Sequence, residues 1–130
     1  MSSQNLKTGD ILTDGVMAIR DQVRDVNTSK NIHSNIKSGV YKIQEGYLGY
    51  ISCFPKNETT EESIDAVFQI LARPDSVDIM VDVSWSNGEL IKEIGKVNIP
   101  NFPDQIERLK DFMTRIAPLV VDTFDQLLSN

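Results

Sequence analysis

The sequence predicts a single α+β domain, an antiparallel sheet of four to five strands packed by helices in the order α-β-β-α-β-β-α. Two observations predict it. Apolar residues recur at steps of three and four near both ends of the chain, which is typical of amphipathic helices. Between them, apolar and polar residues alternate and pause at short glycine-containing turns, which is typical of hairpins. We expect residues 1–130 to share one core.

The first element is a helix from Asp10 to about Asn27. Its apolar stripe consists of Leu12, Val16, Ile19, Val23 and Val26. The polar segment "NTSKNIHSNIKSG" then predicts a loop that leads into extended structure. Aromatic and β-branched runs on either side of Glu45-Gly46 predict a hairpin with strands near 39–44 and 47–54.

A second helix is expected from about Thr59 to Arg73. Thr59 precedes Glu62 by three residues, the spacing of a capping box, and Pro74 follows the end of the segment. The apolar positions Ile64, Val67, Phe68 and Leu71 would form one face of this helix.

The segment from Val77 to Ile99 predicts a second hairpin around Asn87-Gly88. Its first strand alternates a core set (Val77, Ile79, Val81, Val83, Trp85) with a solvent set (Asp78, Met80, Asp82, Ser84). A two-residue loop would pair Trp85 with Leu90 and Val81 with Ile94, whereas a three-residue loop would pair Val83 with Ile91 and Val77 with Val97. Because a slip of one residue reverses every side chain, we expect a bulge near Gly95 to reconcile the two registers.

The last element is a long helix that starts at Asn101-Phe102-Pro103 and ends at Leu128. Asn is a favoured capping residue, and proline is favoured in the first turn. The predicted stripe comprises Phe102, Ile106, Leu109, Met113, Ile116, Val120, Phe124 and Leu127.

Composition excludes several classes of function. The net charge of −6 disfavours binding to nucleic acid or to anionic lipid, because both require many Lys and Arg side chains. No apolar run reaches the roughly 20 residues that span a bilayer. One cysteine, Cys53, permits no internal disulfide, and the first residues do not resemble a signal peptide, so we expect a cytoplasmic protein.

We predict no catalytic residue, no metal site and no cofactor. His33 is the one histidine and lies in the polar loop, without a neighbouring Cys or second His to share a metal ion. Cys53 follows an apolar run and is expected to be a small buried residue. Glycine-rich phosphate loops and paired CxxC motifs are absent from the sequence.

Two groups of residues are candidates for binding a protein partner. Asp78 and Asp82 share one face of a strand, and Glu93 on the return strand joins them in one register. Tyr41, Tyr47 and Tyr50 crowd the first hairpin, and tyrosine is enriched at interfaces. The alternatives are an ordinary solvated sheet face and ordinary strand residues.

The order of elements and the closing pattern "VSWSNGELIKEIGKVNIPNFPDQIERLKDFMTRI" resemble the type III secretion chaperone-like fold. The resemblance implies a nonenzymatic, commonly dimeric protein that holds an extended segment of a client protein, with Val81, Val83 and Trp85 as inner-sheet residues. The family pattern has three strands before its middle helix, where two are predicted here. Either part of "SKNIHSNIKSG" is extended or the fold differs.

Three functions therefore remain open. The first is a protein-binding module, chaperone-like or adaptor-like, in which surplus apolar residues form a partner surface or a homodimer. The second is a small acidic immunity or inhibitor protein that masks a basic surface. The third is an enzyme or ligand-binding domain with a pocket that converges from several strands.

Overall fold

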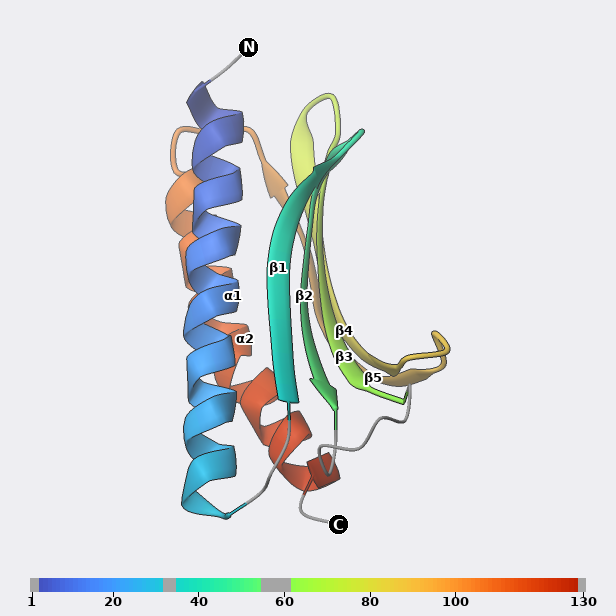
Figure 1. Ribbon diagram of the computed structural model, residues 1–130. Coiled ribbons are helices and arrows are strands. Elements are labelled where there is room, and N and C mark those ends of the chain that lie inside the picture. The colour runs from blue at the N-terminus through green and yellow to red at the C-terminus, as the bar shows by residue number, and fades with distance from the viewer. Residues whose placement is uncertain (1–2, 32–34, 55–61, 129–130) are drawn as a thin grey trace.

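The computed structural model is a two-layer α+β domain and describes residues 3–31, 35–54 and 62–128, with side chains from residue 8 onward. The order of elements is α1 (Ser3–Ser29), β1 (Asn35–Ile43), β2 (Gly46–Phe54), β3 (Ile64–Ala72), β4 (Ser76–Trp85), β5 (Leu90–Pro100) and α2 (Gln105–Leu128). The strands form one five-stranded antiparallel sheet in chain order (Figure 1). The predicted fold class is confirmed.

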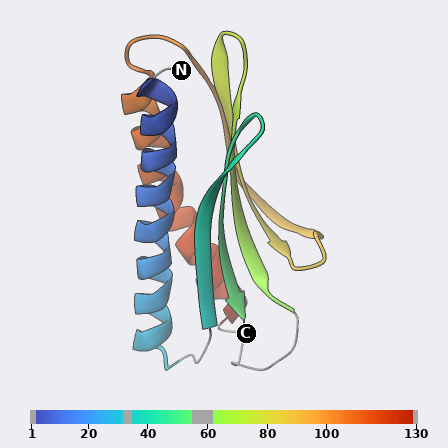
Figure 2. The ribbon, with the colours of Figure 1, turned by 45° about the horizontal axis from the view of Figure 1, so that its top comes forward.

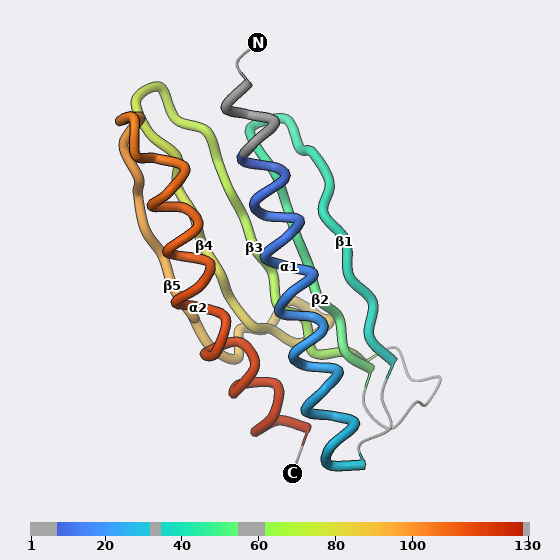
Figure 3. The backbone as a smooth tube through the Cα atoms, turned by 90° about the vertical axis from the view of Figure 1, so that its left-hand side faces the viewer, coloured from blue at the N-terminus to red at the C-terminus, as the bar shows by residue number. Residues whose placement is uncertain are grey.

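Both helices lie on the same face of the sheet (Figures 1 and 2). Seen from the helix side, α1 passes over the β1–β3 half of the sheet and α2 over the β4–β5 half (Figure 3). The strands bow toward the helices, so the other face is the concave side of the sheet (Figure 1). No described element covers that concave face, which we call the uncovered face.

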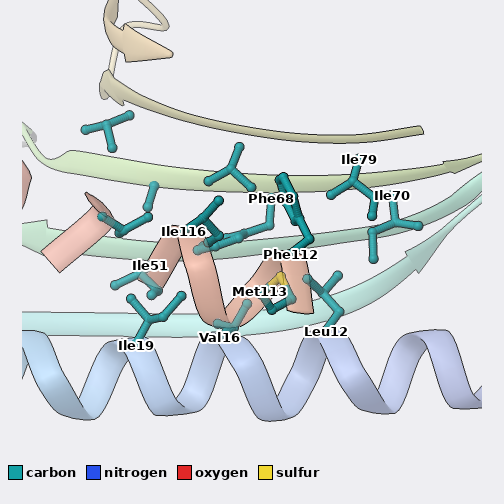
Figure 4. Close-up of a cluster of buried hydrophobic side chains, with 14 of the residues drawn as sticks. Leu12, Val16, Ile19, Ile51, Phe68, Ile70, Ile79, Phe112, Met113 and Ile116 are labelled. Carbon is teal, nitrogen blue, oxygen red and sulfur yellow. The ribbon is translucent and has the colours of Figure 1, made fainter. Parts of the chain in front are cut away.

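The core lies between the helices and one alternating set of strand residues (Figure 4). The predicted α1 positions Leu12, Val16, Ile19 and Val23 are at most 1% exposed. They face the buried strand residues Ile51, Cys53, Ile64, Ala66, Phe68, Ile70, Ile79, Val81, Val83 and Ile99. From α2 come Leu109, Phe112, Met113, Ile116, Val120 and Phe124. Burying a side chain of this size contributes about 1.5–3 kcal/mol.

The predicted helix at residues 59–73 is wrong, because residues 64–72 form the central strand β3. Burial alternates strictly along it, with Ile64, Ala66, Phe68 and Ile70 under the helices. Val67 and Leu71, which fit a helical stripe, lie on the uncovered face. The proposed cap Thr59 lies outside the described residues.

The β4–β5 hairpin contains both of the alternative registers and a third. At the turn, Trp85 N–H donates to Glu89 O, which encloses the three-residue loop Ser86–Gly88. The register then shifts by one residue at Ile91 and again at Ile94. The bulge expected near Gly95 is confirmed, and Ile91 and Ile94 both pack against the core.

Four predicted boundaries or positions differ from the structure. α1 starts at Ser3, not at the predicted Asp10. β1 already starts at Asn35, inside the segment predicted as a loop. α2 starts at Gln105, whose side-chain amide donates to Asn101 Oδ1 at 2.6 Å, so residues 101–104 form a turn and Phe102 is 61% exposed. Trp85, at the end of β4, is 38% exposed, although Val81 and Val83 are fully buried.

The strand assignment of β3 predicts opposite sensitivities for two neighbouring residues of similar size. Ile70→Ala should lower the free energy of unfolding by about 3 kcal/mol, since it leaves a cavity in the core. Leu71→Ala should cost about 1 kcal/mol, because Leu71 is half-buried on the uncovered face. Urea unfolding of both variants measures the difference. A helix would give the reverse order, because Leu71 belongs to the helical stripe and Ile70 does not.

Candidate functional site

The uncovered face is the candidate site, and its residues follow from strand alternation. Residues that neighbour a buried strand position along the chain point away from the helices. The register places Tyr50 opposite both Gly39 and Val67, and Val67 opposite Asp82, which in turn lies opposite Glu93. A single row across the sheet therefore passes from an aromatic side chain to two carboxylates.

The face divides into two halves. The apolar half comprises Tyr41, Leu48, Tyr50, Val67, Leu71 and Met80, on strands β1 to β4. Tyr41 is 52% exposed, and the other five are half-buried. The acidic half comprises Asp78, Asp82 and Glu93, on β4 and β5. The uncovered face therefore combines six apolar side chains with three carboxylates and with Lys96, which lies opposite Met80.

Tyr50 and Gly39 fit together on the apolar half. A Cβ atom built on Gly39 would lie 3.0 Å from Tyr50 Cε1, so the phenol ring lies over the glycine of the neighbouring strand. At the other end of β1, the Lys37 ammonium lies 5.5 Å from the centre of the Phe54 ring, in cation–π range. Aromatic rings thus lie across the β1–β2 pair on this face.

The predicted group of tyrosines is divided between the two faces of the sheet. Tyr41 and Tyr50 lie on the uncovered face, but Tyr47 is on the helix face, where a Cβ atom on Gly9 would lie 2.8 Å from its ring. Tyr47 also lines a pocket of about 180 Å³ between α1 and the β1–β2 turn. The other lining residues are Thr8, Lys42, Gln44, Glu45, Gly46, Ile70, Ala72 and Val77.

Two of the three carboxylates of the predicted acidic strip lie together in the structure. Asp82 and Glu93 are directly opposed across β4 and β5. Asp78 lies further along β4 and is satisfied by other groups, since Asn98 Nδ2 donates to it at 2.6 Å and Arg73 Nε at 2.7 Å. Both bonds stabilise the charged form, and they hold the pKa of Asp78 below its ordinary value.

Asp82 has the opposite electrostatic environment. Burial raises its pKa, the neighbouring Glu93 raises it further, and Lys96 lowers it. Two like charges directly opposite each other on adjacent strands are destabilising. Among the described residues, neither Asp82 nor Glu93 has an ion pair or a side-chain hydrogen bond. The isolated chain therefore keeps two close carboxylates that a cation from elsewhere would stabilise.

Among the described residues weighed for chemistry, Cys53 and the opposed pair Asp82 and Glu93 lie on opposite faces of the sheet. Cys53 is fully buried and accepts a hydrogen bond from Asn27 Nδ2 at 4.0 Å. His33 lies outside the described residues. Within the described ranges, no three His, Cys, Asp or Glu side chains are placed to hold a metal ion. The pocket beside Tyr47 is smaller than the roughly 300–1,000 Å³ typical of ligand sites. Neither described helix is long and apolar enough to cross a membrane.

Sequence reasoning missed Leu48, Val67, Leu71 and Met80 as members of the site. The available signal was that Leu48, Val67 and Leu71 are apolar at positions of β2 and β3 that alternate with the core residues. A strand buried on one face only would show polar residues at every second position. Apolar residues on both faces of a strand indicate a second surface that water alone does not explain.

The comparisons with known proteins add no assignment. No family model matches the chain, and no curated protein or solved structure matches it either. The resemblance to the type III secretion chaperone-like fold stays a prediction.

The two aspartates predict opposite effects of charge removal on stability. The pKa of Asp82 is raised in the folded state, so its charged form opposes folding, and the free energy of unfolding falls as pH rises through that pKa. Asp82→Asn should therefore stabilise the protein at neutral pH, by roughly 0.5 kcal/mol for relief of one like-charge pair. This gain should vanish when the pH falls below the unfolded aspartate value.

Asp78→Asn is the matched control. Its folded pKa is lowered, so its contribution is present above the unfolded pKa and is lost as pH falls through the folded one. Asp78→Asn should destabilise at neutral pH, and this loss should fade in acid. Urea unfolding over a pH series measures both variants. Equal signs at neutral pH would contradict the electrostatic difference described for the two carboxylates.

Proposed function

We propose that the protein is a nonenzymatic protein-binding module whose uncovered face holds a segment of a partner protein with apolar and basic side chains. The single observation that carries the proposal is the composition of this face, six apolar side chains beside the opposed Asp82 and Glu93. A chaperone-like or adaptor-like role fits such a surface.

The apolar half would supply most of the binding energy. Its side chains are half-buried by their own neighbours, with Tyr41 more exposed, so a partner can remove their remaining surface from water. Removal of apolar surface is worth roughly 25 cal/mol per Å². Tyr41 and Tyr50 also carry hydroxyl groups, which give a partner polar contacts at the edge of the apolar surface.

The acidic half would select the partner. A Lys or Arg side chain placed between Asp82 and Glu93 relieves their repulsion and gains two attractive contacts. The net charge of −6 adds long-range attraction for a basic protein. An acidic segment would be repelled by Asp82 and Glu93 on the same face, so charge provides discrimination as well as attraction.

Masking of a basic surface by a small acidic inhibitor or immunity protein is the second candidate. The opposed pair of carboxylates favours it, because charge complementarity is its main requirement. The two functions differ in which half of the face carries the binding energy. Binding through the acidic half weakens steeply with salt, whereas binding through the apolar half persists in salt.

Reversal of the acidic pair should weaken binding of a natural partner. Tagged wild-type protein, the variant Asp82→Lys/Glu93→Lys and the control Asp14→Lys/Asp25→Lys are each used to capture proteins from native extract. The control makes the same charge change at two exposed positions of α1. A partner captured by the wild type is then purified, and its affinity for all three proteins is measured by calorimetry at low and high salt.

We expect the face variant to bind at least about tenfold more weakly, and the control to match the wild type. Leu48→Ser on the apolar half should weaken binding in high salt, where the acidic half contributes little. Equal losses in the face variant and the control would contradict the proposed site. Loss only from the charge reversal, with complete dissociation in salt, would favour the inhibitor function over the chaperone-like one.

A further inference from the structure

The two edges of the sheet differ in regularity. β5 forms one edge and is interrupted by the two bulges at Ile91 and Ile94. β1 forms the other edge, and its register with β2 runs without a shift from Asn35 to Ile43. A regular, unbulged edge strand can pair with a further strand, whereas a bulged one resists such pairing.

The outer edge of β1 offers unpaired backbone groups. The two-residue turn Gln44–Glu45 makes Ile43 and Gly46 a hydrogen-bonded pair, so every second residue back from Ile43 bonds to β2. The N–H and C=O groups of Ile36, Ser38, Val40 and Lys42 therefore point outward. Figure 3 shows β1 at the margin of the sheet, with no described strand beyond it.

One of the two lysines of this edge strand, Lys37, is turned inward. Lysine on an edge strand discourages pairing when its charge projects outward. Here the Lys37 ammonium lies over the Phe54 ring of β2, on the inner side of β1. Gly39, at the middle of the strand, projects no side chain, and the Tyr50 ring from β2 lies over it.

We propose that β1 pairs antiparallel with β1 of a second copy of this chain, about a two-fold axis at Gly39. In an antiparallel pair, residues opposite each other share a face, so the paired positions must both be odd or both be even. The register centred on Gly39 is the one that pairs the whole strand. It places Ser38 opposite Val40 of the second copy, and both carry outward backbone groups.

The charges on β1 agree with this register. Lys37 comes to lie opposite Tyr41 of the second copy on the uncovered face, and this pair carries no like-charge repulsion. Lys42 comes to lie opposite Ile36 on the helix face. No lysine opposes a lysine, whereas registers centred on residue 37 or 42 would place two lysines face to face.

The flank of α1 beside this edge supplies an independent observation. Arg20 Nη1 donates to Ser38 Oγ at 3.4 Å, so this side of α1 lies next to β1. Met17 precedes Arg20 by three residues, on the same helical flank, and is 44% exposed. It lies level with Gly39, since Val16 contacts Gly49, the β2 partner of Val40. The exposed apolar side chain of α1 is therefore close to the proposed two-fold axis.

The dimer would join two sheets into one continuous sheet with all helices on the same side. The two uncovered faces would become one surface, with Tyr41 and Tyr50 of both copies at its centre. This inference rests on the edge strand and not on the proposed partner site, so either can fail without the other.

The test exploits the predicted register, in which Lys37 lies opposite Tyr41 of the other copy. Within one chain these residues are four positions apart on a strand, about 13 Å, and do not meet. Sedimentation equilibrium over a concentration series should show dimers of the wild type. Tyr41→Lys should weaken dimerisation about tenfold, because two Lys–Lys pairs form across the axis. Adding Lys37→Glu to Tyr41→Lys should restore it, because each new lysine then faces a glutamate.

Circular dichroism and thermal unfolding check that each variant is folded, and Asp14→Lys/Asp25→Lys serves as a charge control that should stay dimeric. A wild type that is monomeric at every concentration would overturn the proposal. So would a dimer that the Tyr41→Lys change does not weaken, or one that the second change does not rescue. The variant Asp82→Lys/Glu93→Lys should dimerise normally, which separates this interface from the partner site.

Discussion

The structure depends on burial of one alternating set of strand side chains beneath two helices that lie on the same side. The apolar stripe of α1 and that of α2 cover this set and close the core. Because strand side chains alternate, every residue buried by the helices fixes a neighbour that faces away from them. Packing of the core therefore decides which residues lie on the uncovered face. It does not decide whether those residues are polar or apolar.

Helix packing also explains why the two sheet edges differ. α2 approaches β5 closely at Gly95, where a Cβ atom would lie 3.2 Å from Ile116 Cγ2 and 3.3 Å from Phe112 Cζ. Ile91 and Ile94 are three residues apart, so in a regular strand they would lie on opposite faces and only one of them could face the core. The bulges let Ile91 and Ile94 both pack on the core, at the cost of a regular edge. β1 needs no bulge and stays regular. Gly39 leaves room for the Tyr50 ring, and Gly49 leaves room for Val16 and Val40.

Sequence reasoning located most elements because their periods are unambiguous. The α1 stripe, the two hairpins and most of the α2 stripe lie where the pattern predicts them, and Asp82 meets Glu93 across the second hairpin. The predictions fail where the local pattern does not show which face of the sheet a helix covers or where a helix begins. Tyr47 and Tyr50 are three residues apart on a strand, so they must face opposite sides, and only the position of α1 decides which side is core. Phe102 fits the α2 stripe by spacing, but it precedes the helix in a turn and stays exposed.

The largest failure, the helix expected over β3, has the same physical origin as the candidate site. The segment is apolar at 64, 66, 67, 68, 70 and 71, so it satisfies a period of two and a period near four at once. A strand covered on one side would carry polar residues at positions 67 and 71, and the strand period would then have been evident. Val67 and Leu71 stand there instead, on the uncovered face. Val67 lies between Tyr50 and Asp82, and Leu71 lies two rows further along, beside Asp78. Val67 and Leu71 hide the strand period of β3 in the sequence, and these are the apolar residues of β3 that do not pack in the core. The alternation that buries Ile64, Ala66, Phe68 and Ile70 therefore places two large apolar side chains, each half-buried, on the uncovered face of the central strand.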